Sequence, residues 1–214
     1  MKKILYITCN SKPESISASK TVAKYLLEEV TSKCKELEVK EIDLYKIDIP
    51  QLRYEYFDFR STLVKSDKLD EQGKNDITRI KAIAEEFKTG DYYIIAAPLW
   101  NMKSPGPLSN YIDCISLNGI TIEISKEKIG GLLDDKNRKM IFVQSSGGYV
   151  TAGKPYAQEN HPGVYLKEIF GFMGIKDYYE VLVENTGYTE EEKQKAIDKG
   201  KEDSKKLVNE IISK

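Results

Sequence analysis

One stretch decides the fold of this chain: Tyr92-Tyr93-Ile94-Ile95-Ala96-Ala97-Pro98-Leu99-Trp100-Asn101-Met102-Lys103-Ser104-Pro105-Gly106-Pro107-Leu108. Its opening apolar run is typical of a buried strand in a parallel sheet. Pro98 has no N–H to donate within a sheet, so we predict that the strand ends there. Pro107 suits the first turn of a helix. The stretch therefore predicts a strand, a loop and a helix, with residues 99–102 at the carboxyl edge of an α/β sheet, where such folds bind ligands.

The composition bounds the class of protein. A chain of 214 residues, 40% hydrophobic and 31% charged, is long enough for one domain with a full core, and we expect a single domain over residues 1–214. Its formal net charge of -1 argues against nucleic-acid binding. No apolar run approaches the length of a membrane helix, and the apolar N-terminal stretch is too short for a signal peptide.

The three cysteines, Cys9, Cys34 and Cys114, show no CxxC spacing. An odd number without such spacing argues against a disulfide framework or a zinc site and favours a reduced, cytoplasmic location. We interpret Cys9 and Cys114 as small core residues. The single histidine, His161, precedes Pro162 in a predicted loop, where we expect an exposed side chain.

Apolar periodicity predicts five alternations of strand and helix along the chain. The strands are expected at 3–9, about 39–44, 92–98, 139–145 and 178–183, and the helices at about 22–30, 77–87, 108–115, 164–173 and from Thr189 to the C-terminus. Alternation of this kind indicates an α/β fold with a doubly wound parallel sheet between two layers of helices. For five strands we predict the flavodoxin-like order 2-1-3-4-5. Ile120, Ile122 and Ile124 alternate with polar residues and indicate a small extra hairpin outside that sheet.

Residues 45–73 carry an unusual number of aromatic side chains, namely Tyr45, Tyr54, Tyr56, Phe57 and Phe59. A loop of this length usually has a function or some structure of its own. We predict short helical turns that pack on the body of the protein or on a partner subunit.

Three loops at the predicted carboxyl edge contain residues suited to binding a ligand. The first contains Asn10 and Ser17-Ala18-Ser19, where hydroxyls and backbone N–H groups gather at a helix start. Such a start can bind a phosphate without lysine or arginine. The same residues also suit simple N-capping by Ser17 or Ser19.

The other two loops follow the third and fourth strands of the predicted sheet. Trp100 offers a flat apolar face beside free backbone N–H groups, although a single tryptophan often fills a core instead. Ser145-Ser146-Gly147-Gly148 contains glycines that permit φ > 0 and close backbone approach, or that form an ordinary turn. Together the three loops predict a phosphate pocket, an aromatic wall and a glycine floor. The sequence has neither GxGxxG nor GxxxxGK[ST], so a Rossmann dinucleotide site or a Walker loop is not indicated.

Six motifs together resemble one known family over essentially the whole chain. They are Lys3-Ile4-Leu5, Ser17-Ala18-Ser19, Ala97-Pro98-Leu99-Trp100-Asn101, Pro107-Leu108-Ser109-Asn110-Tyr111-Ile112-Asp113, Ser145-Ser146-Gly147-Gly148 and Phe170-Gly171-Phe172-Met173-Gly174-Ile175. The family is that of the FMN-dependent NADH azoreductases, also called FMN-dependent NADH:quinone oxidoreductases. The sequence departs from the family's usual pattern at Asn10, Ser109, Ser146 and Val150.

The resemblance implies FMN as cofactor and assigns it three groups of residues. Asn10, Ser17, Ala18 and Ser19 would hold the phosphate; Pro98, Leu99, Trp100, Asn101 and Met102 would line the isoalloxazine ring; Ser145, Ser146, Gly147 and Gly148 would serve its pyrimidine edge. It further implies hydride transfer from NADH or NADPH through FMN to a quinone or azo compound, by ping-pong kinetics and with no catalytic side chain. It implies a homodimer with sites at the interface, where residues 54–59 would cover the partner's flavin.

Two other functions stay open on the sequence. One is a flavodoxin-type electron carrier, against which the near-neutral charge and the extra segments at 45–73 and 118–136 count. The other is a flavodoxin-like interaction domain with no cofactor.

Overall fold

The centre of the molecule is a parallel sheet, seen in a computed structural model that describes residues 1–34, 36–58, 62–155 and 157–212. Its five strands are β1 (Lys2–Thr8), β2 (Leu37–Asp43), β3 (Tyr92–Pro98), β6 (Lys139–Ser145) and β7 (Asp177–Val183), in the order β2-β1-β3-β6-β7. A separate antiparallel hairpin, β4 (Ile122–Ile124) and β5 (Ile129–Gly131), precedes the fourth strand of the sheet. The predicted order 2-1-3-4-5 and the extra hairpin are therefore confirmed.

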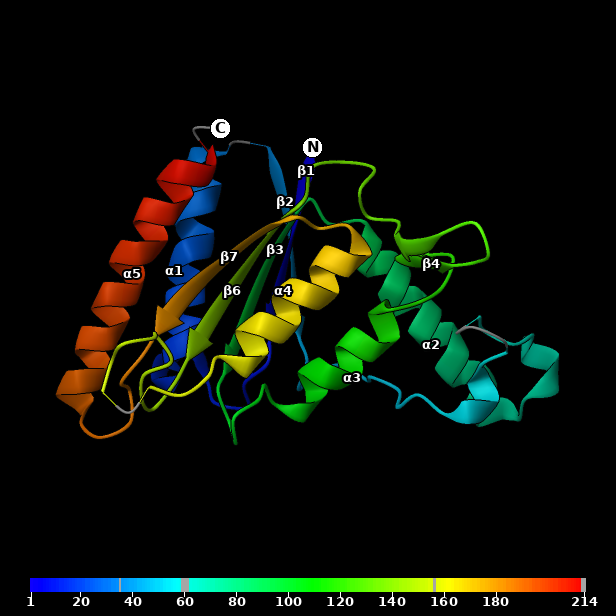
Figure 1. Cartoon of the computed structure of the whole chain (residues 1–214), viewed down its shortest axis with the longest axis horizontal. Helices are drawn as coiled ribbons and strands as arrows, with labels where there is room; N and C mark the ends of the chain where they lie inside the picture. Colours follow the sequence, from blue (N-terminus) through cyan, green and yellow to red (C-terminus); the bar gives the residue numbers. More distant parts are fainter. Residues whose placement is uncertain (35, 59–61, 156, 213–214) are drawn as a thin grey trace.

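Helices cover both faces of this sheet (Figure 1). On one face lie α1 (Ala18–Lys33) and α5 (Glu190–Ile212), and on the other lie α2 (Glu71–Lys88), α3 (Gly106–Ile115) and α4 (His161–Met173). Each face has its own apolar core because the side chains of every strand alternate between the two. All seven residues of β3 and of β6 are buried, as expected for central strands covered on both sides.

Local signals in the sequence set the ends of several helices. Ser17, rather than Ser19, is the N-cap of α1, since its Oγ accepts a hydrogen bond from the Lys20 backbone N–H at 3.3 Å. Gly174 ends α4 in the left-handed region at φ +105°. His161 is exposed as predicted, but the prediction that it lies in a loop is wrong, because α4 begins at this residue, with Asn160 as N-cap.

The stretch that decides the fold behaves as predicted at both prolines. Pro98 is the last residue of β3, and Pro107 lies in the first turn of α3. The register pairs Pro98 with Ser145, and the Leu99 N–H donates to the Ser145 carbonyl at 2.7 Å. The loops after β3 and β6 therefore leave the sheet side by side.

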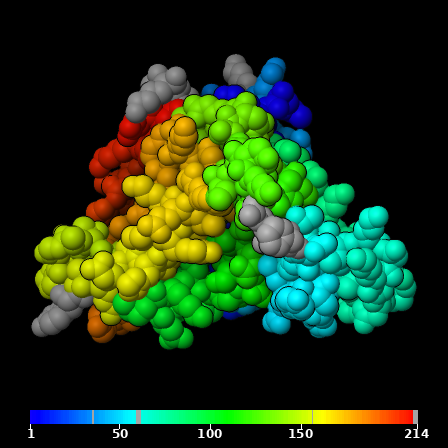
Figure 2. Space-filling view, turned by 45° about the vertical axis from the view of Figure 1, so that its right-hand side comes forward, coloured from blue at the N-terminus to red at the C-terminus, as the bar shows by residue number. Residues whose placement is uncertain are grey.

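The aromatic segment forms short 3-10 turns, at Tyr54–Tyr56 and Ser66–Lys68, as predicted. Tyr56 is buried, and its hydroxyl donates to Asp76 of α2, so the segment packs on the body of the protein. Tyr54, in contrast, is 94% exposed. The segment projects beyond α2 and α3 and forms the cyan lobe of Figure 2. Phe59 lies outside the described residues, and packing against a partner stays a prediction.

Across the described parts of the chain, every helix is too short or too polar to cross a lipid bilayer.

Candidate functional site

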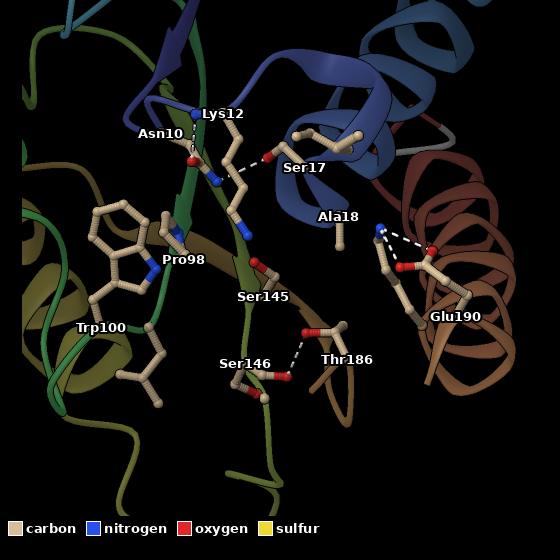
Figure 3. Close-up of a pocket in the computed structure, with 14 residues that line it drawn as sticks. Asn10, Lys12, Ser17, Ala18, Pro98, Trp100, Ser145, Ser146, Thr186 and Glu190 are labelled. Atoms are coloured by element: carbon tan, nitrogen blue, oxygen red, sulfur yellow. Dashed lines mark hydrogen bonds and ion pairs between the residues drawn. The ribbon is translucent and has the colours of Figure 1, made fainter. Parts of the chain in front are cut away.

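Two adjoining cavities lie at the carboxyl edge of the sheet. The first, of about 280 Å³, is lined by Asn10, Lys12, Ile16, Ser17, Ala18, Pro98, Leu99, Trp100, Ser145, Ser146, Gly147, Thr186, Glu190 and Lys193 (Figure 3). The second, of about 330 Å³, is lined by Leu99, Asn101, Met102, Ser146, Gly147, Gly148, Tyr149, Val150 and Gln158. Leu99, Ser146 and Gly147 line both, so the two cavities adjoin. Of the residues predicted for the site, Ser19 alone lines neither cavity.

The loop after β1 forms a rigid, polar end of the first cavity. Asn10 Nδ2 donates to Ser17 Oγ at 2.9 Å, while Asn10 Oδ1 accepts the Lys12 backbone N–H at 3.0 Å. Asn10 and Ser17 are both buried. Ser19 is buried behind Ser17, with its Oγ 3.4 Å from that of Ser17. The backbone N–H of Ala18, in the first turn of α1, has no acceptor within the helix and is available to an anion.

The loop after β3 forms the opposite end. Trp100 is 39% exposed, so it does not fill the core and instead forms a wall of the first cavity. Its backbone N–H donates to the Lys103 carbonyl at 2.8 Å, and the Lys103 N–H donates back at 3.0 Å. Asn101 and Met102 complete this tight turn at φ +48° and +65°, the mirror image of a type I turn.

Two consecutive non-glycine residues in the left-handed region are strained, and strain of this kind gathers at ligand sites. The hydrogen bonds of the turn use the N–H groups of Trp100 and Lys103. They leave the N–H groups of Asn101 and Met102 for a ligand in the second cavity.

The floor consists of two loops joined by hydrogen bonds. The backbone N–H and the hydroxyl of Thr186 each donate to the Ser146 carbonyl at 3.0 Å, and Ser146 Oγ donates to the Gly148 carbonyl at 2.7 Å. Gly147 and Gly148 permit φ > 0, but neither adopts it. The close backbone approach belongs to Gly187, where a Cβ would lie 2.9 Å from the Gly147 carbonyl oxygen.

Comparisons with known proteins identify the family of this chain. A family profile described as Flavodoxin-like fold matches residues 2–208. The chain is 45% identical to the FMN-dependent NADH:quinone oxidoreductase of Clostridium botulinum (strain Alaska E43 / Type E3), over 99% of this chain and 100% of that protein. The chain belongs to the FMN-dependent NADH:quinone oxidoreductase family. Another member of this family, from Ruminiclostridium cellulolyticum, is 42% identical over 99% of this chain and 100% of its own length.

Two solved structures are similar to the structure of this chain. One is an FMN-dependent NADH-azoreductase from Bacillus anthracis str. Ames Ancestor in complex with FMN, with a TM-score of 0.80, 27% identity and coverage of 97% of this chain and 100% of that one. An azoreductase from Bacillus anthracis str. Sterne has a TM-score of 0.82 at 23% identity, over 98% and 100% of the two chains, and supports the fold.

Five residues of the first cavity escaped the sequence-based prediction: Lys12, Ile16, Thr186, Glu190 and Lys193. Three of them follow β7, the last strand of the sheet. The topology offered a signal for these three, because the carboxyl end of β7 meets the same edge as those of β1, β3 and β6. Glu190 and Lys193 form an ion pair at 3.2 Å.

The reactive side chains near the site are not poised for catalysis. Burial raises the pKa of the Cys9 thiol to about 12, so it stays protonated at neutral pH and is not a nucleophile. The chain's one histidine, His161, lines a different cavity between α3 and α4. Cys9 and His161 therefore supply no catalytic group to these cavities.

Proposed function

We propose that this chain is an FMN-dependent NADH oxidoreductase that reduces quinones or azo compounds. One observation carries the proposal. Loops from four strands meet around two adjoining cavities, which offer hydrogen-bond donors suited to a phosphate at one end and an exposed tryptophan beside free backbone N–H groups at the other. Relatives of 45% and 42% identity over nearly the whole chain, both named FMN-dependent NADH:quinone oxidoreductase, support it.

The residues present fit this cofactor. Asn10, Ser17 and Ala18 would hold the phosphate through neutral donors, and Ser19 would support Ser17 from behind. Pro98, Leu99, Trp100, Asn101 and Met102 would line the ring. Ser145, Ser146, Gly147 and Gly148 would serve its pyrimidine edge. The hydrogen bonds within the loops fix these groups before any ligand arrives, which lowers the cost of binding.

When bound, FMN would supply the hydride and electron-transfer chemistry between NADH and the acceptor. The chain's contribution is to hold the cofactor by its buried end and to leave the ring end open. Trp100 and Met102 are both partly exposed there. Donor and acceptor would use this same opening in turn, which predicts ping-pong kinetics.

An anaerobic absorption spectrum of the purified protein, recorded before and after NADH is added, tests the proposal. We expect a flavin band that NADH bleaches and that a small quinone restores. A colourless protein that takes up no added FMN would contradict it. Slow steady-state turnover of NADH and quinone by a yellow protein would favour the flavodoxin-type carrier instead.

We also propose that the chain is a homodimer with the flavin site at its interface. Val164, Tyr165 and Phe172 expose apolar surface on α4. Beside them a cavity of about 140 Å³ opens between α3 and α4, with Leu108 and Ile112 among its walls. A second copy would cover this surface, and the exposed Tyr54 of the aromatic segment would reach toward the partner's site.

The molar mass in solution, measured by light scattering, tests the dimer. The Tyr165→Glu variant should dissociate, because it places a charge within an apolar interface. Tyr188→Glu is the matched control, since Tyr188 is more exposed than Tyr165 and lies in the loop between β7 and α5. A wild-type protein of monomer mass at micromolar concentration would contradict the proposal.

A further inference from the structure

We propose that two lysines from separate elements, Lys12 and Lys193, clamp the phosphate of FMN, and that Glu190 holds Lys193 until the cofactor arrives. This inference rests on the proposed function. It adds charge to a site whose predicted phosphate ligands are all neutral. A phosphate monoester carries a charge of about −1.5 to −2 at pH 7, so neutral donors alone leave most of that charge without a counterion.

Lys12 brings a positive charge to the loop after β1. Its backbone N–H is bound to Asn10, which fixes where its side chain begins. From there the side chain extends into the cavity toward Ser145 (Figure 3). No carboxylate of the described residues lies within 4 Å of its ammonium group. A phosphate held by Ser17 and Ala18 would be within the space that this flexible side chain sweeps.

Lys193 approaches the cavity from α5. Its side chain is only 20% exposed, whereas that of its partner Glu190 is 89% exposed. An ion pair with one fully hydrated member contributes little, because water already solvates the carboxylate. Glu190 is also the first residue of α5, where the helix dipole stabilises a carboxylate without help from a lysine. Lys193 can therefore leave Glu190 for a more highly charged anion at small cost.

The three charged residues surround the polar end of the cavity. Asn10 and Ser17 lie above it, Lys12 crosses it, and Glu190 lies at the side formed by α5 (Figure 3). The phosphate would thus be neutralised by Lys12 from the loop after β1 and by Lys193 from α5. Glu190 would then face outward to solvent.

Flavin binding to the full-length apoprotein tests the clamp, with FMN and riboflavin as paired probes. The two ligands share the ring and differ in the phosphate, so the ratio of their dissociation constants isolates the phosphate contribution. We expect Lys12→Met and Lys193→Met each to weaken FMN binding about fivefold to tenfold, the effect of one charge-assisted contact. Riboflavin binding should not change. Added salt should weaken FMN binding to the wild-type protein and bring the two dissociation constants closer together, because it screens the charges.

Two further variants complete the experiment. Lys195→Met is the matched control: it removes the same charge from the same helix, but Lys195 pairs with Glu191 and lines a different cavity. It should leave the ratio unchanged. Glu190→Gln should tighten FMN binding about twofold, since it frees Lys193 and removes a competing carboxylate.

The clamp would be overturned if both lysine variants left FMN binding unchanged, if they weakened riboflavin equally, or if Lys195→Met had the same effect as Lys193→Met. A wild-type protein that binds neither flavin would instead overturn the proposed function, so the two failures are distinct.

Discussion

The two ends of the site are held in opposite ways. At the end that we propose for the phosphate, here called the phosphate end, Asn10 and Ser17 are buried and hydrogen-bonded to each other and to the backbone around them. At the end that we propose for the ring, here called the ring end, Trp100 and Met102 are partly exposed, and the turn that carries Met102 is strained. The first end is fixed by hydrogen bonds between its own residues, and the second is shaped by a left-handed backbone that residues other than glycine disfavour.

This contrast explains how one site can retain a cofactor while it exchanges two substrates. Tight binding needs donors that are fixed in advance, because ordering them on binding would cost free energy. Exchange needs surface that stays open to solvent. The fold provides both because the cofactor's two ends would meet different strands, β1 for the phosphate and β3 with β6 for the ring.

The largest effect is expected at the phosphate end, for Ser17→Ala. The change removes the N-cap of α1 and leaves the buried Asn10 amide without its acceptor. We expect the free energy of unfolding to fall by about 2 kcal/mol, and FMN affinity to fall with it. Urea unfolding measures the first quantity. The control is Ser15→Ala, which lies nearby but is exposed; equal losses in the two variants would show that the phosphate end is not specially rigid.

A second comparison concerns two of the glycines in the floor, Gly147 and Gly187. At Gly187 a Cβ would lie 2.9 Å from the Gly147 carbonyl oxygen, so Gly187→Ala forces backbone apart. We expect it to cost about 1–2 kcal/mol. At Gly147 the nearest atom to a Cβ is Gly187 Cα at 3.7 Å, an ordinary contact. Gly147→Ala should therefore change the free energy of unfolding by less than about 0.5 kcal/mol. Urea unfolding of both variants checks this, and the reverse order would contradict the geometry of the floor.

The sequence predicted most of the fold because its strongest signals are local and agree with one another. The buried run before Pro98, Pro107 at a helix start and Gly174 at a helix end each act through neighbouring residues, so the strand–helix alternation followed from them. The same alternation predicted that Asn10, Ser17, Trp100 and the serine–glycine loop at residues 145–148 lie at the carboxyl edge of the sheet.

What the sequence did not reveal depends on contacts between distant segments. Lys193 lies within a charged helix whose pattern resembles any solvated surface, and only the packing of α5 brings it to the cavity. Gly147 and Gly148 would tolerate a left-handed backbone best, yet neither adopts it. It occurs instead at Asn101 and Met102, because the hydrogen bonds between Trp100 and Lys103 impose it.

The strained turn gives a smaller effect that tests the ring end directly. Met102→Ile places a β-branched side chain at φ +65°, and we expect a cost of about 1 kcal/mol. Met102→Gly relieves the strain but adds freedom to the unfolded chain, so the two contributions should cancel to within about 0.5 kcal/mol. Urea unfolding compares the variants. If isoleucine and glycine behaved alike, the turn would not be held in the left-handed conformation.

The smallest expected effect concerns the Cys9 thiol at the phosphate end, which we expect to be unreactive. Cys9 adjoins Asn10, and burial raises its pKa to about 12; burial also raises the pKa of Cys114, which lies on α3, to about 12. At pH 8 both thiols are protonated and enclosed, so a disulfide reagent should modify only the half-buried Cys34 at first. Cys9 and Cys114 should then react together, at the rate of global unfolding, as followed by mass spectrometry of digested samples. Because Cys114 lies away from the cavity, a Cys9 that reacts faster than Cys114 would mean that the phosphate end opens locally, and the contrast between the two ends would fail.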